Sequence, residues 1–435
     1  MYKVDHFING KSSSESNKTS KIYNPSYGTE IGEVLCATNE VADKAVESAY
    51  KASKAWSKTG LIYRSELILK FRQNVINRSK EIIDLGISEA GKTRPDAEAE
   101  LDRAVQALTH IAGVQHFYPS HYSQNVAGGI DIADLRFPIG VIVGVGPFNF
   151  PILIPLLHSA MALVTGNTYI GKPSEKVPSV SRLYADIWKE SGLPDGCYNV
   201  VNGDKETVEF LVRHEKVDGL AFIGSTAAAK SLKMLGVEHN TKVQALGGAK
   251  NHMIVLPDAD LDMSADAAVS ASFGAAGQRC MAVSVVVAVG DIADELLDKI
   301  KERMPNLIMG VTDDDKTQLG PVISPENKDR IYSFIEGAEP DGATLVVDGR
   351  IRSNSLEGCF VGPTLIDNVK PGMAVYENEI FGPVLSFVRA KTYDEAMKIT
   401  NSNNFGNGAA LFTRDGGVAK KWSDEIQAGS VGINV

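Results

Sequence analysis

From Pro138 onward, short runs of β-branched residues alternate with longer stretches of helical periodicity. Strand-like runs such as IGVIVGV, TYIGK and VDGLAFIG are separated by helix-like stretches such as PILIPLLHSAMALV and SVSRLYADIWKES. This alternation is typical of βαβ units, in which helices connect parallel strands and cover the sheet. A second block begins near Gly247, with strand-like runs HMIVL, SVVVAV and ATLVV and helices near 260–278, 291–303 and 325–337. The sequence therefore predicts an α/β fold with two halves joined near residue 246.

The segment before Pro138 has a different pattern. Residues 40–117 carry apolar side chains at intervals of three and four, which predicts amphipathic helices. The following stretch, PSHYSQNVAGGIDIADLRF at 119–137, lacks that periodicity. A projecting hairpin and a long surface loop both fit it, and composition alone favours the loop.

Composition excludes several classes of protein. The chain has 435 residues, 43% hydrophobic and 23% charged, which is ordinary for a globular protein with two domains. Its net charge of −10 argues against a nucleic-acid partner bound through a broad basic surface. No apolar run is long enough to span a membrane, and the N-terminus lacks the pattern of a secretory signal. We therefore expect no membrane partner and a cytoplasmic location.

The four cysteines point to one reactive thiol. Cys36, Cys197, Cys280 and Cys359 lie far apart, with no C-x-x-C pair and no zinc-type spacing, so neither a disulfide framework nor a metal site is expected. Cys280 differs from the others because it follows FGAAGQ, a run of small residues, and Arg279. The small residues would leave room beside the thiol for a substrate and a flat cofactor. A buried structural thiol is the alternative, as we expect for the other three.

Two turns after predicted strands suggest a dinucleotide, although each also has a plain structural interpretation. IGVIVGVGPFNFP contains Gly144 and Gly146, but the third glycine of the phosphate-binding fingerprint falls at Asn149, so a tight packing turn remains open. In FIGSTAAAK, Ser225 begins a helix whose free amides suit a phosphate, and it is equally an ordinary helix cap.

The strand between these turns ends in GKPSEK, which places Lys172, Glu175 and Lys176 at the edge where open α/β sheets bind ligands. A ribose suits this cluster. The Glu175 carboxylate would accept hydrogen bonds from a 2′-hydroxyl and repel a 2′-phosphate, which favours NAD over NADP. A solvated end of a strand is the alternative.

Five motifs together resemble the aldehyde dehydrogenase superfamily in order and spacing: GPFNFP at 146–151, GNTYIGKPSE at 166–175, FIGST at 222–226, GQRCMA at 277–282 and NEIFGPV at 378–384. The resemblance covers nearly the whole chain. It implies two Rossmann-like α/β domains: an NAD-binding domain of residues 1–117 and 138–246, and a catalytic domain of residues 247–435. It also implies that residues 118–137 form a β-hairpin oligomerisation arm, in a homodimer or homotetramer, instead of a loop.

The resemblance assigns catalytic roles to two residues. Cys280 matches the nucleophile, and Asn149 matches the side-chain donor of the oxyanion hole, with the Cys280 backbone amide as its partner. A thiolate that attacks an aldehyde carbon creates an alkoxide, and the loss of one such donor typically costs about 2.7–4 kcal/mol. This role explains why Asn149 stands where a dinucleotide fingerprint has glycine.

The resemblance also assigns cofactor contacts. Lys172, Glu175 and Lys176 match the adenosine-ribose region and Ser225 the pyrophosphate site. Glu379 matches the carboxylate that holds the nicotinamide ribose. The remaining positions expected beside the cofactor are Gly146, Phe148, Gly247 and Phe381.

Ala245 indicates the acyl acceptor. Hydrolytic members of the superfamily have E-L-G-G where this chain has ALGG, so the base that activates water is missing. General-base assistance is commonly worth about 10² to 10⁴-fold, so attack by water should be slow. A thiol such as coenzyme A ionises more readily than water and needs less help. FGAAGQRCMA and QALGGAKNHMIVLPDADL also resemble the CoA-acylating malonate and methylmalonate semialdehyde dehydrogenases.

Arg279 and Arg103 suggest an anionic substrate. Arg279 resembles the family's arginine that binds the distal carboxylate, and Arg103 in ELDRAV is a candidate second arm. An internal ion pair of Arg279, or an effect on the pKa of Cys280, is the alternative. Oxidation of a 3-oxo acid would place the thioester carbonyl β to the carboxylate. The resemblance then implies loss of CO2, giving acetyl-CoA from malonate semialdehyde or propionyl-CoA from the methyl homologue.

Two other functions remain open at the level of sequence. One is a hydrolytic NAD-dependent dehydrogenase for another anionic aldehyde, such as succinate semialdehyde or a sulfonated aldehyde. The other is a non-catalytic binding or structural descendant. The sequence ends at GSVGINV, where the family continues for several dozen residues. The substrate pocket and the assembly are therefore the parts that the resemblance supports least.

Overall fold

The structure, a computed structural model, describes residues 1–435 with the exception of residue 354. The chain divides into two compact units. Unit 1 comprises Met1–Tyr23, Glu30–Ala90 and Pro95–Gly247. Unit 2 comprises Asn24–Thr29, Gly91–Arg94 and Gly248–Val435.

Unit 1 contains a seven-stranded sheet in the order β12-β11-β8-β9-β10-β2-β3. Its strands are β2 (His6–Ile8), β3 (Lys11–Ser13), β8 (Val141–Val145), β9 (Thr168–Lys172), β10 (Tyr198–Val200), β11 (Gly219–Ile223) and β12 (Lys242–Leu246). The five strands from β12 to β10 run parallel, and β2 and β3 add antiparallel pairs at one edge. The chain builds β8, β9 and β10 in one direction and then crosses to β11 and β12 on the other side of β8. The topological switch point therefore lies between β8 and β11.

Helices cover both faces of this sheet, as the amphipathic pattern predicts. They are α1 (Asn39–Trp56), α2 (Leu61–Asn77), α3 (Ser79–Ala90), α4 (Arg94–Ala112), α5 (Val114–Phe117), α6 (Leu153–Val164), α7 (Ser179–Ser191), α8 (Lys205–Arg213) and α9 (Thr226–Glu238). One hydrophobic core lies between the sheet and the helices α2, α3, α4, α5, α6 and α7, and it includes the stacked rings of Phe71 and Trp188. A second core packs α1, α8 and α9 on the other strand faces. The predicted helices at 40–117 are confirmed.

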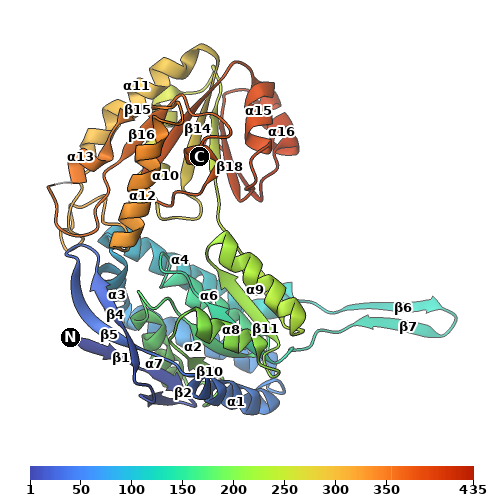
Figure 1. The fold of residues 1–435 in the computed structure, drawn as a ribbon. Helices are drawn as coiled ribbons and strands as arrows, with labels where there is room; N and C mark the ends of the chain where they lie inside the picture. Colours follow the sequence, from blue (N-terminus) through green and yellow to red (C-terminus); the bar gives the residue numbers. More distant parts are fainter. Residues whose placement is uncertain (354) are drawn as a thin grey trace. The chain divides into compact units, whose positions relative to one another are not determined.

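The structure also contains two smaller sheets, of which only the hairpin had been considered from the sequence. A three-stranded sheet near the N-terminus has the order β1-β5-β4, with β1 (Tyr2–Val4), β4 (Lys18–Asn24) and β5 (Thr29–Cys36). The other is a hairpin of β6 (His121–Ala127) and β7 (Ile130–Asp134), paired from His121 with Asp134. It extends away from the rest of unit 1 in Figure 1, and every residue of both strands is exposed. The loop favoured by composition is therefore wrong, and the hairpin implied by the family resemblance is present.

Unit 2 contains a second seven-stranded sheet in the order β15-β16-β17-β14-β13-β18-β19. Its strands are β13 (Asn251–Val255), β14 (Val283–Val289), β15 (Thr344–Val347), β16 (Thr364–Asp367), β17 (Val384–Ala390), β18 (Gly408–Phe412) and β19 (Ser430–Ile433). All neighbouring pairs are parallel except β15 with β16. Apolar side chains of the central strands fill two cores, one on each face.

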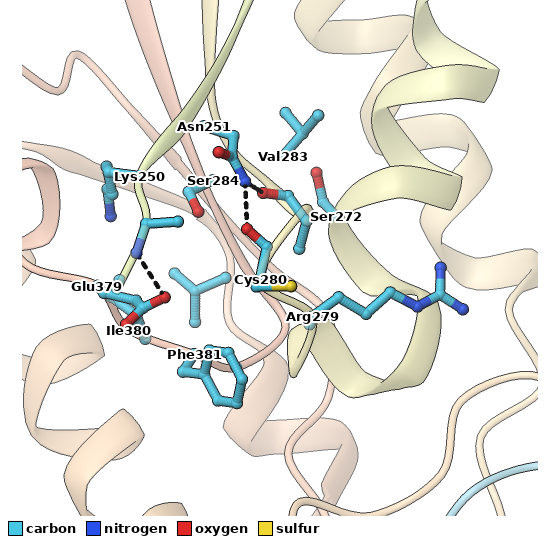
Figure 2. Close-up of a pocket in the computed structure, with 15 residues that line it drawn as sticks. Lys250, Asn251, Ser272, Arg279, Cys280, Val283, Ser284, Glu379, Ile380 and Phe381 are labelled. Carbon is cyan, nitrogen blue, oxygen red and sulfur yellow. Dashed lines mark hydrogen bonds between the residues drawn. The ribbon is translucent and has the colours of Figure 1, made fainter. Parts of the chain in front are cut away.

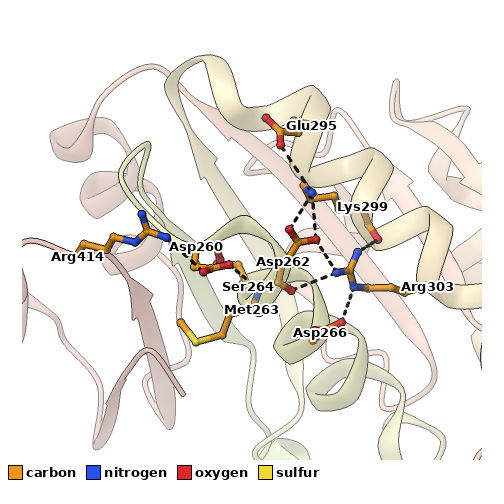
Figure 3. Close-up of polar contacts among 9 residues, drawn as sticks. All are labelled: Asp260, Asp262, Met263, Ser264, Asp266, Glu295, Lys299, Arg303 and Arg414. Atoms are coloured by element: carbon orange, nitrogen blue, oxygen red, sulfur yellow. Dashed lines mark hydrogen bonds and ion pairs between the residues drawn. The ribbon is translucent and has the colours of Figure 1, made fainter.

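The helices of unit 2 follow the α/β pattern. They are α10 (Leu261–Phe273), α11 (Ala293–Arg303), α12 (Pro325–Ala338), α13 (Gly349–Ser353), α14 (Ala374–Glu377), α15 (Tyr393–Asn401) and α16 (Gly416–Glu425), with 3₁₀ turns at Gly274–Gly277, Gly290–Ile292 and Met304–Asn306. Ion pairs join α10 and α11 (Figure 3). Arg303 Nη2 lies 2.8 Å from Asp262 Oδ1, and Lys299 Nζ lies 3.0 Å from the same atom. No helix in the described part of the chain has both the length and the apolar character needed to cross a membrane.

Candidate active site

The cofactor residues predicted in unit 1 gather at one edge of its sheet. Gly146 directly follows β8, Lys172 ends β9, and Ser225 lies in the turn after β11. These three strands are parallel neighbours, so their carboxyl ends meet at one edge, beside the switch point. Phe148 and Asn149, both half-buried, continue the turn after Gly146. The fold therefore brings together residues separated by about eighty positions in the sequence.

Lys172 and Glu175 form the charged part of this edge. Lys172 is 5% exposed, and its Nζ lies 3.5 Å from Glu175 Oε2. Burial lowers the pKa of the lysine, and the carboxylate partly restores it. A buried ammonium beside a half-exposed carboxylate suits the hydroxyl groups of a ribose, to which one donates and the other accepts. Lys176 follows in the same turn and is half-buried.

Ser225 and Gly247 have structural reasons as well as the expected cofactor role. The Ser225 hydroxyl accepts from the Ala228 backbone N–H at 3.4 Å, so it caps helix α9 as the alternative interpretation predicted. A Cβ on Gly247 would lie 3.1 Å from Thr226 Oγ1, which leaves little space for a side chain. The glycine therefore lets the chain after β12 pass close to the start of α9.

The predicted catalytic residues of unit 2 line a narrow pocket (Figure 2). Cys280, Arg279, Glu379 and Phe381 all contribute to its wall, together with Ala249, Lys250, Asn251, Ser272, Gly277, Ala282, Val283, Ser284, Ile380, Gly382 and Val384. Cys280 lies three residues before β14, and Glu379 lies five residues before β17. The pocket is therefore at the amino ends of the strands, opposite to the carboxyl edge where ligands usually bind open α/β sheets.

The small residues before Cys280 have a backbone conformation that the sequence did not suggest. Ala275, Ala276 and Gly277 all have left-handed backbone, with φ of 50°, 53° and 67°. A Cβ at Gly277 would lie 2.2 Å from the carbonyl oxygen of Gly382. Left-handed backbone at a residue with a Cβ costs about 1–3 kcal/mol. The approach to Gly382 therefore requires glycine at position 277, whereas left-handed backbone gives no reason for alanine at positions 275 and 276. The predicted room for a cofactor beside the thiol stays a prediction.

The thiol is in an environment that opposes its ionisation. Cys280 is the one exposed cysteine, and the other three are buried with free thiols. The pocket walls bury the sulfur enough to raise its pKa; its own backbone N–H lowers the pKa, the Glu379 carboxylate raises it, and the Met281 N–H lowers it.

The Glu379 carboxylate is held from the start of β13. Its Oε1 accepts from the Ala249 backbone N–H at 2.9 Å. Burial raises the pKa of Glu379, while the Ala249 N–H, Lys250 and Arg330 lower it. Lys250 is 2% exposed and donates to the carbonyl oxygens of Val375 (2.7 Å) and Asn378 (2.8 Å). This buried lysine therefore fixes the loop that carries Glu379.

The two arginines expected to bind a carboxylate differ in setting. The Arg279 side chain is directed away from the thiol in Figure 2, and a Cβ on Gly274 would lie 2.7 Å from its Nη1. Arg103 is exposed on α4 in unit 1, with Nη1 3.4 Å from Gln106 Oε1. The two belong to different units, so they remain separate candidates.

Three residues of the pocket region were missed by sequence reasoning. Lys250, Asn251 and Asn407 contact the backbone around Glu379 and Cys280. One signal was available: Lys250 and Asn251 are polar residues that lead directly into the fully buried strand β13. Asn407 gave no such signal, because it lies among other polar residues in the sequence NSNNFGN.

One group in the described residues has atoms close enough to hold a metal, although no metal was expected. Asp43, Glu47 and His214 bring ligand atoms within 4.8 Å of one another. His214 Nε2 lies 3.1 Å from Asp43 Oδ1, and Lys216 forms an ion pair with Glu47. The lysine already supplies positive charge, so the cluster is satisfied by the protein.

A pocket with an exposed thiol in one α/β unit and an open parallel-sheet edge at a switch point in the other fit the class of NAD-dependent dehydrogenases. The sequence matches the model of the aldehyde dehydrogenase family over residues 12–435, and the chain belongs to this family.

Two similar proteins are semialdehyde dehydrogenases by name. Malonate-semialdehyde dehydrogenase of Halalkalibacterium halodurans is 39% identical over 434 residues, covering 100% of this chain and 90% of the relative. The acylating mitochondrial methylmalonate-semialdehyde/malonate-semialdehyde dehydrogenase of Homo sapiens is 40% identical, covering 99% of this chain and 81% of the relative.

Two solved structures of similar proteins are also semialdehyde dehydrogenases by name. Methylmalonate-semialdehyde dehydrogenase of Oceanimonas doudoroffii superposes with a TM-score of 0.98 at 40% identity, covering 100% of this chain and 90% of that one. A putative methylmalonate-semialdehyde dehydrogenase of Sinorhizobium meliloti 1021, solved in complex with NAD, superposes with a TM-score of 0.97 at 40% identity. The match covers 100% of this chain and 89% of that one.

Proposed function

We propose that this protein oxidises a short anionic semialdehyde with NAD and transfers the acyl group from Cys280 to coenzyme A. The substrate class follows the relatives, whose names specify malonate and methylmalonate semialdehyde and, for the human enzyme, acylation. The observation that carries the choice of acceptor is Ala245. It lies half-buried in β12, opposite Phe222 of β11, where hydrolytic members have the glutamate that activates water.

The chemistry begins at Cys280. Its thiolate forms a bond to the aldehyde carbon, and the carbonyl oxygen takes the negative charge, which the Asn149 carboxamide and the Cys280 N–H would stabilise. Bound NAD would supply the acceptor for the hydride that leaves this carbon. Glu379, already held by the Ala249 N–H, would bind the nicotinamide ribose, and Phe381 would pack beside it.

The acyl group then leaves Cys280. A coenzyme A thiolate attacks the thioester carbonyl, the carbon–sulfur bond to Cys280 breaks, and Cys280 leaves as the thiolate. With a 3-oxo acid, the thioester carbonyl is β to the carboxylate, so loss of CO2 gives acetyl-CoA from malonate semialdehyde or propionyl-CoA from the methyl homologue. Arg279 would bind the substrate carboxylate bidentately, and Arg103 is the separate second candidate for this role.

In this proposal, residues 1–117 and 138–246 form the NAD-binding domain and residues 247–435 form the catalytic domain. Gly146, Lys172, Glu175, Lys176 and Ser225 would bind NAD. The remaining contacts would come from Phe148 and Gly247. Support comes from the sheet edge at the switch point, which matches the usual position of a dinucleotide. The half-exposed Glu175 carboxylate favours NAD because it would repel a 2′-phosphate.

We further propose a homodimer or homotetramer located in the cytoplasm. The β6–β7 hairpin is a two-stranded sheet without a core, and such a hairpin is marginally stable alone in water. Its exposed apolar side chains include Tyr122, Ile130 and Ile132. Packing against another copy would bury them. The four cysteines are free, which suits a reducing compartment.

The decisive experiment follows NADH formation from malonate semialdehyde with and without coenzyme A and identifies the product by mass spectrometry. We expect sustained turnover with coenzyme A and acetyl-CoA as the product. Full turnover without coenzyme A would instead indicate a hydrolytic enzyme. Absence of NADH with this and other anionic aldehydes would indicate a non-catalytic protein. The Cys280→Ala variant is the matched control and should form no NADH.

A further inference from the structure

The Asn251 carboxamide spans three segments of unit 2 around the nucleophile. It is 4% exposed, at the first position of β13. Its Nδ2 donates to the carbonyl oxygens of Cys280 (2.9 Å) and Ala282 (2.8 Å), and its Oδ1 accepts from the Gly408 N–H (2.9 Å). Figure 2 shows the bonds that run from Asn251 to this backbone. Because both amide hydrogens and the oxygen are engaged, the group has one orientation.

Asn407 donates to the same carbonyl from another element. It lies just before β18, is exposed, and its Nδ2 is 2.9 Å from the Cys280 oxygen and 3.1 Å from Met281 Sδ. The Cys280 carbonyl therefore accepts from two carboxamides. Packing alone does not need this arrangement, since one donor already satisfies a backbone carbonyl.

The Cys280 carbonyl and the Met281 N–H are the two polar groups of one peptide bond. Bonds accepted at the oxygen of a peptide strengthen its N–H as a donor, by roughly 10–30% per bond. The Met281 N–H is one of two backbone donors that lower the pKa of the Cys280 thiol, against the effects of burial and Glu379. The two carboxamides are thus connected to the sulfur through one peptide group.

We propose that Asn251 and Asn407 are positioning residues for the nucleophile, which hold and polarise the Cys280–Met281 peptide beside the thiol. The inference rests on the proposed role of Cys280 as the nucleophile. It adds a means of activating the thiol that needs no cationic side chain.

The test measures alkylation of Cys280 by iodoacetamide as a function of pH, by mass spectrometry of the full-length protein without substrate. The other cysteines are buried, so they compete little. Asn407→Ala is the first variant, because this side chain is exposed and its loss should not impair folding. Asn251→Ser is the second. The matched control is Asn401→Ala, which removes bonds to the backbone at Glu425 and Gln427.

We expect Asn407→Ala to raise the midpoint of alkylation by about 0.3–0.5 pH unit, since the Met281 N–H then becomes a weaker donor. Asn251→Ser should raise it further, and kcat should fall several-fold with KM for NAD unchanged. Asn401→Ala should behave as the unmodified protein.

A midpoint in Asn407→Ala equal to that of Asn401→Ala would overturn the proposal, even if Asn251→Ser fails to fold. The result does not depend on turnover, so an incorrect substrate leaves it unaffected. In contrast, a Cys280 that resists alkylation in the unmodified protein at every pH would contradict its role as the nucleophile.

Discussion

At the scale of single residues, the proposed function attributes the choice of acyl acceptor to Ala245, which has no carboxylate to activate water. We predict that Ala245→Glu increases NADH formation without coenzyme A by at least about tenfold, because a general base commonly contributes about 10² to 10⁴-fold. Position 245 is half-buried at the end of β12, so the longer side chain has access to solvent. The measurement is steady-state turnover with and without coenzyme A.

Ala245→Gln is the control for that substitution. It has nearly the shape of glutamate and cannot accept a proton. Coenzyme A-independent turnover that rises equally in both variants would show that a change of packing, and not a base, admits water.

The burial of Lys250 should make the stability of the protein depend on pH. Burial lowers its pKa to about 7, from an ordinary value of 10.5, while Glu379 and Glu377 act in the opposite direction. Between these two values the unfolded chain binds more protons than the folded one, so stability increases with pH. We predict that the free energy of unfolding of the unmodified protein, minus that of Lys250→Met, rises between pH 7 and pH 10, on the order of 1 kcal/mol per pH unit.

Urea denaturation followed by tryptophan fluorescence at several pH values measures this difference. Lys230→Met, which removes an exposed lysine from α9, is the matched control. A difference that does not change with pH for Lys250→Met would mean that the lysine is charged in the folded protein throughout this range.

At the scale of elements, periodicity predicted most of the structure, and the failures have physical causes. The helices at 40–117 and the βαβ strands have strong patterns because each buries a defined face. β1, β2 and β3 have three residues each, too short for a pattern to emerge. β6 and β7 bury nothing, so their sequence resembles that of a loop.

The candidate site was predictable only in part for a related reason. Motifs identified the residues with reactive groups, among them Cys280, Glu379 and Lys172. Asn251 and Asn407 act on backbone carbonyls, and the carbonyl they share is defined by the approach of β13 to β18. No spacing in the sequence encodes that approach, so the structure was needed to find them.

The exposed β6–β7 hairpin is predicted to hold copies of the protein together. Ile130 and Ile132 are 54% and 56% exposed, on a strand with no apolar partner beneath it. We predict that Ile130→Lys with Ile132→Lys reduces the oligomer to a smaller species, measured by light scattering after size exclusion, with little change in melting temperature at low protein concentration. Val237→Lys, a matched change at an exposed position of α9, should leave the mass unchanged. An unchanged mass in the hairpin variant would exclude the arm from assembly.

At the scale of the whole molecule, cofactor binding should appear as stability. A ligand that binds only the folded chain stabilises it by mass action, by about 2.7 kcal/mol at one hundred times Kd. We predict that NAD raises the melting temperature more than NADP at equal concentration, because Glu175 lies at the edge of β9 where a 2′-phosphate would meet its carboxylate. Thermal unfolding with each nucleotide measures the two shifts.

Glu175→Gln separates charge from shape in that comparison. The amide keeps an acceptor for a ribose hydroxyl and removes the negative charge, so the shift with NADP should increase toward that with NAD. Lys172, 3.5 Å from Glu175 in the unmodified protein, would lose its ionic partner and become available to a phosphate. If NADP remains equally weak in Glu175→Gln, the discrimination arises elsewhere in unit 1, and Glu175 is then a structural partner of Lys172 and not the residue that selects the nucleotide.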